Sequence, residues 1–204
     1  PGNAIHEIVN NERLVGGLTE VSGLMAESLY SRFTKGKILL CTDREAEMAK
    51  LVENSFRDVN IAFANEVARI ATHLGVRAER VIELANRHPR VNILSPGVGV
   101  GGHCISVDPW FLVSAAPLQS KMISQARKSN DNQPENIAKD ILAYFDKHSL
   151  KRIVLLGLAY KADSDDLRES PAIEIVKKIR ATKPEMSICV VEPNISQAVA
   201  DKLF

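Results

Sequence analysis

The sequence predicts a mixed α/β protein in which an all-helical middle lies between two incomplete α/β pieces. Apolar residues between Thr42 and Gly75 step by three or four, with no Gly or Pro between the two ends, and this predicts one very long helix. Short apolar runs alternate with helical patterns before Thr42 and again after Lys151, which is typical of α/β units.

The N-terminal piece is predicted to be a strand, a helix and a strand. Arg13 to Thr19 is typical of a strand that ends in a glycine turn. Ser22 to Thr34 has apolar residues at helical spacing, and Lys37 to Thr42 is typical of a short buried strand. This unit has no beginning, so we expect residues 1–42 to be the end of a larger α/β domain.

The long helix has sequence signals at both ends. Thr42 and Glu45 match a capping box, and Gly75 stands where a C-terminal glycine belongs. At ~1.5 Å per residue the helix would extend on the order of 45 Å, so we expect a second subunit to cover what one small domain leaves exposed. Its apolar stripe consists of Met48, Val52, Phe56, Val59, Phe63, Val67, Ile70 and Leu74.

Polar residues on the other side of this helix are candidates for a site. Lys50 and Asn54 lie one turn apart, away from the apolar stripe. Asn disfavours helix interiors, so Asn54, Asn60 and Asn65 in one helix indicate side-chain partners for some of them. Lys50 and Asn54 are either part of a solvated face or donors to a developing oxyanion. The sequence leaves both interpretations open.

The segment from Ser95 to Pro109 holds four glycines, a histidine and a cysteine. Gly97, Gly99 and Gly102 have the spacing G-x-G-x-x-G, but the dinucleotide motif needs a helix that begins at its last glycine. Here the next helix is predicted to begin at Asp108-Pro109, with Asp108 as its N-cap. We therefore interpret the segment as a glycine-rich loop and not as a dinucleotide site.

Cys104 is the residue that this loop presents. A thiolate in such a loop can be stabilised by backbone N–H groups or a cation, which makes Cys104 a candidate nucleophile. Most free cysteines are small buried thiols instead. On spacing alone the two interpretations are equally open.

The remainder of the middle is predicted to be helical. Helices are expected over Arg77 to Asn86 and Trp110 to Ala115, and over Lys121 to Lys147 with a kink or break near Asn130 to Asn132 and Pro134.

The C-terminal piece opens a parallel α/β unit. We expect strands over Arg152 to Gly157 and Ser187 to Val191, and a helix that Ser170-Pro171 starts. Ligands of such units lie beyond the carboxyl ends of the strands. Lys161 and Arg168 lie there and suit a phosphate, although solvated loops of this kind are common.

Glu192 ends the second of these strands, where dinucleotide-binding units have a ribose acceptor. No glycine-rich turn follows Gly157, so we assign no NAD site to this unit.

Composition excludes several classes of protein. The 204 residues are 45% hydrophobic and carry a formal charge of +1, with no basic block to indicate nucleic acid and no apolar run long enough to cross a membrane. The three cysteines are far apart and no histidine cluster accompanies them, so we expect no metal site and a reduced, cytoplasmic setting.

Three segments in order resemble the UDP-glucose/GDP-mannose dehydrogenase family. They are EMAKLVENSFRDVNIAFANEVARIA, HPRVNILSPGVGVGGHCISVDPWF and GLAYKADSDDLRESPAIEI. The combination of HPRVNIL with GGHC and DPWF is most similar to the branch of the family that acts on UDP-N-acetylmannosamine. This likeness extends over nearly the whole chain.

The resemblance implies a domain organisation and a reaction. Residues 1–42 would end an NAD-binding Rossmann domain, residues 43–148 would form the central helical domain that makes a homodimer, and residues 149–204 would begin a Rossmann-like domain for the UDP-sugar. Members of the family oxidise the sugar C6 alcohol to a carboxylate with two NAD. Such a protein would serve cell-surface polysaccharide synthesis.

The resemblance also assigns roles to residues. Cys104 would capture the aldehyde as a thiohemiacetal and later carry a thioester, Lys50 and Asn54 would stabilise the oxyanions, and Asp108 would assist proton transfer. Lys161 would contact the nucleotide phosphates.

A second set of residues would bind the substrate. Arg90 would reach the sugar nucleotide of the neighbouring subunit, and the backbone of Gly97, Gly99 and Gly101 would line the sugar. Arg168 completes the set of expected substrate-binding residues.

The family's NAD fingerprint and its catalytic Glu would lie upstream of Pro1. We therefore expect this chain to be a piece of the enzyme, inactive alone and binding NAD weakly or not at all. UDP-glucose, UDP-N-acetylglucosamine and GDP-mannose remain open as substrates. A non-catalytic dimerisation module is the alternative of another class.

Overall fold

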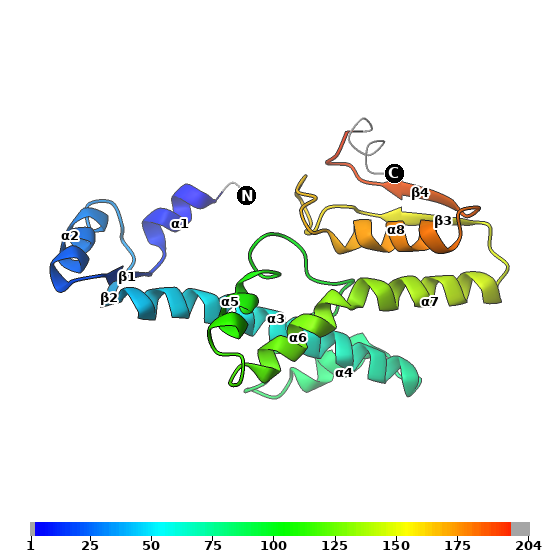
Figure 1. Cartoon of the computed structure of the whole chain (residues 1–204), viewed down its shortest axis with the longest axis horizontal. Helices are drawn as coiled ribbons and strands as arrows, with labels where there is room; N and C mark the ends of the chain where they lie inside the picture. Colours follow the sequence, from blue (N-terminus) through cyan, green and yellow to red (C-terminus); the bar gives the residue numbers. More distant parts are fainter. Residues whose placement is uncertain (1–2, 197–204) are drawn as a thin grey trace. The chain divides into compact units, whose positions relative to one another are not determined.

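The computed structural model describes residues 3–196, which form twelve helices and strands in a mixed α/β arrangement (Figure 1). The chain divides into two compact units, Pro1–Glu53 and Asn54–Phe204. The boundary between them falls inside helix α3, Asp43–His73, which has 31 residues.

The first unit contains a small parallel sheet. Strands β1 (Arg13–Gly17) and β2 (Ile38–Thr42) pair with Arg13 opposite Ile38, and helix α2 (Glu20–Tyr30) connects them. These elements confirm the predicted strand, helix and strand. Helix α1 (Ala4–Asn10), which has no buried residue, was not predicted.

The capping box at the start of α3 is confirmed. The Thr42 N–H donates to Glu45 Oε2 over 2.8 Å, and the Glu45 N–H donates to Thr42 Oγ1 over 3.2 Å. The hydrogen bond from the Thr42 backbone lowers the pKa of Glu45. At the other end Gly75 has φ of +70°, the left-handed conformation that ends many helices.

The second unit begins with helices that precede and follow the glycine-rich loop in the sequence. After α3 come α4 (Ala78–Ala85), α5 (Asp108–Ala115), α6 (Lys121–Asp131) and α7 (Gln133–Lys147). The predicted break in the last helical segment occurs at Asn132. In the part of the chain that the structure describes, no helix combines the length and the apolar character that crossing a membrane requires.

The C-terminal α/β unit has the predicted order. Strands β3 (Arg152–Leu156) and β4 (Ser187–Val191) pair in parallel with Arg152 opposite Ser187. Helix α8 (Pro171–Thr182) connects them and lies between α7 and the sheet (Figure 1). The core between these layers contains Ala138 of α7 with Ile175 and Ile179 of α8.

Ser170 starts α8 as predicted, but its hydroxyl does not cap the helix. The hydroxyl donates to the Leu158 carbonyl over 2.5 Å instead. This bond connects the start of α8 to the segment that follows β3.

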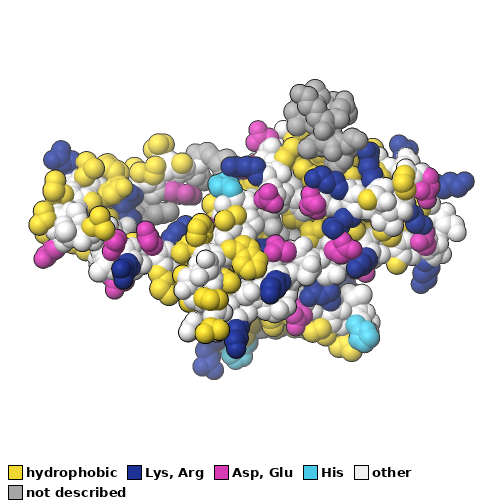
Figure 2. All heavy atoms as spheres, in the orientation of Figure 1, with side chains coloured by type: hydrophobic (Ala, Val, Ile, Leu, Met, Phe, Trp, Pro, Cys, Tyr) yellow, Lys and Arg dark blue, Asp and Glu magenta, His cyan; other side chains and the backbone are white. Residues whose placement is uncertain are grey.

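The strands were expected to bury the cysteines that they contain, but Cys41 of β2 and Cys189 of β4 are only half-buried, and each lies in a sheet of two strands. On the face drawn in Figure 2, acidic and basic side chains are interspersed, and no block of one sign stands out.

Candidate active site

Cys104 lies in a tight turn between the glycine-rich loop and α5, and its side chain is exposed. The backbone N–H groups of Val107 and Asp108 both donate to the Cys104 carbonyl, over 3.0 and 2.8 Å. The Ser106 hydroxyl donates to the Gly102 carbonyl over 2.5 Å. The turn therefore fixes the backbone of Cys104 while the thiol remains accessible.

Asn54 of α3 contacts the end of this turn. Its side chain is buried, and Nδ2 donates a 2.5 Å hydrogen bond to Oδ2 of Asp108. The prediction that Asp108 is the N-cap of α5 is wrong. Asp108 is the first residue of the helix, Val107 precedes it, and no side chain caps the start, because the Asp108 carboxylate is bound to Asn54.

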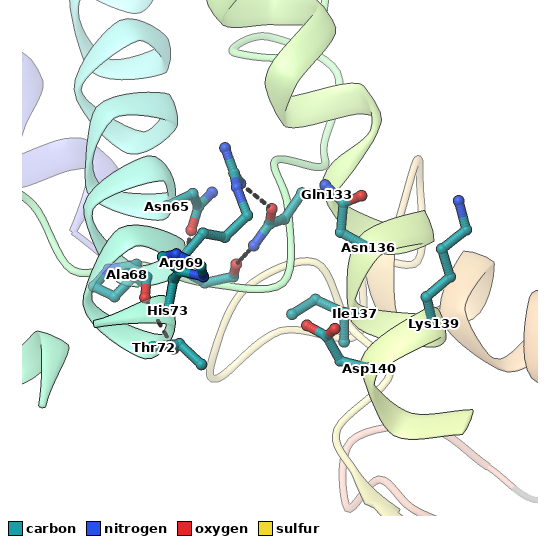
Figure 3. A pocket seen from close by; sticks show the side chains of 12 residues that line it. Asn65, Ala68, Arg69, Thr72, His73, Gln133, Asn136, Ile137, Lys139 and Asp140 are labelled. Atoms are coloured by element: carbon teal, nitrogen blue, oxygen red, sulfur yellow. Dashed lines mark hydrogen bonds between the residues drawn. The ribbon is translucent and has the colours of Figure 1, made fainter. Parts of the chain in front are cut away.

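The start of the glycine-rich loop is held at Gly97 by two buried amides. The Gly97 N–H donates to Oδ1 of Asn65 over 2.8 Å, and the Gly97 carbonyl accepts from Nε2 of Gln133 over 3.1 Å. Arg69 donates to Gln133 Oε1 over 2.8 Å. Figure 3 shows Asn65 and Arg69 of α3 and Gln133 of α7 beside a pocket of about 590 Å³, which Gly97 also helps to line.

The end of the loop packs tightly against the segment after β3. A Cβ on Gly101 would lie 2.5 Å from the Glu169 carbonyl oxygen, and one on Gly102 would lie 2.7 Å from the Tyr160 ring. The Gly102 N–H donates to the Arg168 carbonyl over 3.0 Å. The glycines are thus required by close backbone packing, a reason that the spacing of the motif did not reveal.

Arg168 and Asp166 form a two-pronged ion pair. Arg168 Nε lies 2.9 Å from Asp166 Oδ1, and Nη2 lies 2.6 Å from Oδ2. These side-chain hydrogen bonds hold the pKa of Asp166 well below its usual value. The side-chain hydrogen bond to Asp166 is the largest cause of the raised pKa of Arg168.

Lys161 lies on the same segment, with its ammonium 5.2 Å from the centre of the Tyr160 ring. Gly99 has φ of +142°, and a Cβ at this position would lie 3.0 Å from Pro171 Cβ. The structure therefore brings Asn54, Asp108 and the glycine-rich loop together with the segment that holds Lys161 and Arg168.

Two other predicted site residues form local contacts of their own. Lys50 belongs to the first unit, where it forms an exposed ion pair with Glu53 over 3.3 Å. Arg90 is exposed, and its backbone N–H donates to His88 Nδ1 over 3.3 Å.

The β3–α8–β4 unit does not fit a dinucleotide. The carboxylate of Glu192 accepts hydrogen bonds from the N–H groups of Leu158 and Ala159, over 2.8 and 3.2 Å. The Leu158 bond is the largest cause of the lowered pKa of Glu192. The acidic residue therefore closes the turn after β3 and is not free for a ribose. Among residues 3–196, no group of three or more His, Cys, Asp or Glu could hold a metal ion.

Another pocket, of about 360 Å³, has Val107 and Trp110 and the acidic residues Asp131, Glu169 and Glu174 among the residues that line it. Three acidic side chains do not suit nucleotide phosphates.

The sequence analysis missed four buried polar residues near the loop, which are Asp58, Arg127, Asn130 and Gln133. Of these four, only Asp58 could have been recognised from the sequence, since it lies one turn after the candidate residue Asn54 on the same side of α3.

The chain matches two models of one family, described as the UDP-glucose/GDP-mannose dehydrogenase family. Residues 44–132 match its central domain, and residues 154–203 match its UDP binding domain.

Similar proteins include a UDP-N-acetyl-D-mannosamine dehydrogenase of Campylobacter jejuni, 50% identical over 97% of this chain and 48% of that protein. An NDP-N-acetyl-D-galactosaminuronic acid dehydrogenase of Ralstonia solanacearum is 48% identical over 96% of this chain and 46% of its own length. The chain therefore spans about half the length of the curated relatives it matches.

Similar solved structures include the UDP-N-acetyl-mannosamine dehydrogenase of S. aureus. It aligns with a TM-score of 0.86 at 39% identity, over 96% of this chain and 47% of that one. The corresponding dehydrogenase of Pyrococcus horikoshii aligns with a TM-score of 0.86 at 42% identity, over 97% and 49%.

Proposed function

Because the chain belongs to the UDP-glucose/GDP-mannose dehydrogenase family, we propose that the protein containing it oxidises the C6 alcohol of UDP-N-acetylmannosamine to a carboxylate. The observation that carries this proposal is the exposed Cys104 in a turn whose end, Asp108, is hydrogen-bonded to the buried Asn54. UDP-N-acetylmannosamine is chosen because relatives 50% and 48% identical to this chain are named for that substrate.

Cys104 is the nucleophile in this proposal. Its thiolate forms a C–S bond to the C6 aldehyde, and the carbonyl oxygen becomes an alkoxide that takes up a proton. Loss of one hydride from C6 would give the aldehyde and loss of a second would turn the adduct into a thioester, with NAD as the proposed acceptor of both. Hydrolysis of the thioester then adds water to the carbonyl carbon, breaks the C–S bond and releases the carboxylate and the free thiol. The aldehyde adduct and the tetrahedral adduct of water with the thioester both carry negative charge on the former aldehyde oxygen. Hydrogen-bond donors near Cys104 would therefore lower the barrier to both steps.

Asn54 and Asp108 act on that oxygen and its proton. The Asn54 amide has a second N–H besides the one bound to Asp108, and amide donors stabilise oxyanions in a buried setting. The Asp108 carboxylate is in reach of the same amide and can hold a proton during addition and release. Lys50 is proposed as a further oxyanion donor.

NAD is proposed as the hydride acceptor of the complete protein. The β3–α8–β4 unit does not fit it, since Glu192 is bound to the Leu158 and Ala159 N–H groups. We assign no residue of this chain to NAD, and we expect the isolated chain to show no dehydrogenase activity.

The substrate-binding proposal rests on the segment after β3 and on the glycine-rich loop. Lys161 carries the cation for the nucleotide phosphates. Arg168, whose charge is paired with Asp166 and whose carbonyl accepts the Gly102 N–H, is proposed to bind the substrate next to the loop. Gly99 and Gly101 are proposed to line the sugar. Gly97 lines the pocket of about 590 Å³, although both of its backbone polar groups already have partners. Arg90 is proposed to reach the nucleotide of a second subunit.

We propose that α3 forms a homodimer interface through its apolar stripe. In the second unit Phe56, Phe63 and Ile70 of this stripe are each more than half exposed, while Asn54, Asp58 and Asn65 on the polar side are buried. A helix that buries its polar face and exposes its apolar face is typical of an interface. The division into residues 1–42, 43–148 and 149–204 is proposed with it.

Steady-state assays on the complete natural protein test the proposed function. We expect two NADH per UDP-N-acetylmannosamine, and lower kcat/KM for UDP-glucose, UDP-N-acetylglucosamine and GDP-mannose. Cys104→Ala is expected to abolish turnover, while Cys189→Ala is the matched control that retains it. Folded protein that oxidises none of these sugars would refute the dehydrogenase proposal and favour a non-catalytic dimerisation module.

A second candidate substrate is a nucleotide-linked N-acetylgalactosamine sugar. It is favoured by the Ralstonia solanacearum relative at 48% identity, which is named for the galactosaminuronic acid. Higher kcat/KM for the galacto sugar than for UDP-N-acetylmannosamine would decide for this alternative.

A further inference from the structure

Asp58 of α3 and Arg127 of α6 form an ion pair that is completely buried, with both side chains 0% exposed. Arg127 Nη1 donates to Asp58 Oδ1, and Arg127 Nε donates to Asp131 Oδ1 over 3.1 Å. A buried ion pair is seldom more stabilising than apolar residues of the same size, because both charges lose their hydration. Stability alone therefore does not account for this pair.

Arg127 also contacts the turn that presents Cys104. The same Nη1 that binds Asp58 lies 3.5 Å from the carbonyl oxygen of Ile105, the residue after Cys104. One guanidinium thus connects α3, α6 and the backbone next to the thiol. A planar guanidinium has donors in fixed directions, so it can hold both acceptors at once.

Asp58 is held from a second side by Asn130. Asn130 Nδ2 donates to the backbone carbonyl and to Oδ1 of Asp58, each over 2.9 Å. Burial raises the pKa of Asp58, and the charge of Arg127 and the Asn130 hydrogen bond oppose that rise. Arg127 and Asn130 together offset the cost of burying the Asp58 carboxylate. Through the same contact, Asp58 holds the Arg127 guanidinium next to α3.

The two contacts fix the turn at two points. Asp58 lies one helical turn after Asn54, so both side chains project from the same side of α3. Asn54 holds Asp108, and Asp58 holds Ile105 through Arg127. Cys104 precedes Ile105, and its carbonyl accepts the N–H of Asp108.

We propose that Asp58 and Arg127 are positioning residues that hold the Cys104 turn against α3, so that Cys104 keeps its place in the turn whose end, Asp108, is bound to Asn54. This inference rests on the proposed function of Cys104. Neither residue touches substrate in it, and both act through the backbone of Ile105.

The test replaces the pair by apolar residues of similar size in the protein as its source makes it. The variant Asp58→Leu/Arg127→Met removes both charges together and leaves no unpaired buried ion, so its unfolding temperature should stay near that of the wild type. The Ile105 carbonyl loses its donor. The matched control is Arg80→Met/Glu83→Leu, which removes an exposed ion pair of α4.

Two readouts report position and not stability. Hydrogen exchange of the Val107 and Asp108 amides, which donate to Cys104, should accelerate about tenfold or more while the amides of α8 are unchanged. The kcat should fall about tenfold to a hundredfold with little change in KM, since small displacements of a reacting group cost that much. The control variant should change neither.

A double variant with wild-type exchange at Val107 and Asp108 and wild-type kcat would overturn the proposal. If the double variant does not unfold cooperatively, Arg127→Lys decides instead. It keeps a charge opposite Asp58, but a single ammonium lacks the guanidinium's fixed set of donors, so the same two changes are expected, and their absence overturns the proposal.

The exchange measurement needs no turnover, so it separates this proposal from the function. A protein that oxidises no nucleotide sugar would refute the proposed function. Accelerated exchange in its double variant would still support the positioning of the turn, and unchanged exchange would overturn it.

Discussion

Asn54 and Asp108 are 54 positions apart in the sequence, and their side chains share a 2.5 Å hydrogen bond. This bond connects the middle of α3 to the first residue of α5. It places an amide donor and a carboxylate together at the end of the turn that begins with Cys104.

Replacement of Asn54 by Ala should therefore lower both stability and activity. The Asp108 carboxylate loses its partner, which costs about 1–3 kcal/mol of unfolding free energy for a partly buried group. The kcat should fall on the order of a hundredfold if the amide stabilises the oxyanion. Denaturant unfolding and NADH formation measure the two effects.

Asn60→Ala is the control for that substitution, since its amide donates to the Phe56 carbonyl within the same helix. It should change stability by about 0.5 kcal/mol or less and leave kcat unaltered. Equal effects of the two substitutions would show that Asn54 has no special role.

Gly101 and Gly97 should respond differently to Ala. A Cβ on Gly101 would lie 2.5 Å from the Glu169 carbonyl oxygen and 2.8 Å from Tyr160 Cβ, so Gly101→Ala should destabilise the protein by about 1–3 kcal/mol. Gly97→Ala meets nothing within 4 Å and should be close to neutral. Urea unfolding of both variants measures the difference, and similar losses would argue against close packing at Gly101.

The Asp166–Arg168 pair should give a stability contribution that depends on pH. The hydrogen bonds from Arg168 lower the pKa of Asp166 below the usual 3.8, so the folded state binds fewer protons than the unfolded state in acid. The contribution to stability is complete above the pKa of Asp166 in the unfolded state. It is lost as the pH falls from that value through the lower pKa of the folded state. Arg168→Met should therefore be less stable than wild type near neutral pH, with a difference that shrinks in acid.

Thermal unfolding between about pH 7 and pH 2 tests this expectation. Lys177→Met, which removes an exposed ion pair with Glu174, is the control. An acid-side slope that is the same in wild type and Arg168→Met would contradict the lowered pKa of Asp166.

Cys104 should react with iodoacetamide faster than the other two cysteines. It is exposed in a turn, while Cys41 and Cys189 are half-buried in strands. Peptide mass spectrometry over a time course gives the three rates. Equal rates for all three would argue against an accessible thiol at Cys104.

Local signals in the sequence were enough to predict most of the fold. The capping box of Thr42 and Glu45 and the glycine at position 75 mark the ends of the α3 region because both depend on neighbouring residues alone. The strand, helix and strand at each end of the chain follow from short apolar runs. Helix α1 was not predicted because its seven residues are too few for an apolar pattern to be distinctive.

Contacts between distant residues could not be predicted in the same way. A charged residue in a helix does not reveal its partner, so Asp58 and Arg127, 69 positions apart, gave no sign of their buried pair. Glycine is required at positions 101 and 102 because Glu169 and Tyr160, which are distant in the sequence, pack where a Cβ would lie. Asp108 was assigned to a helix cap because Asn54, whose amide binds its carboxylate, lies 54 positions away in the sequence.

Mass spectrometry of the Cys104 peptide after an acid quench tests the central claim most directly. The protein as its source makes it is mixed with UDP-N-acetylmannosamine and NAD and stopped during turnover. The account predicts a sugar nucleotide linked as a thioester to Cys104, and no such adduct in the Cys104→Ala variant, which should not turn over. Full turnover by Cys104→Ala, without an adduct on the wild-type peptide, would contradict it.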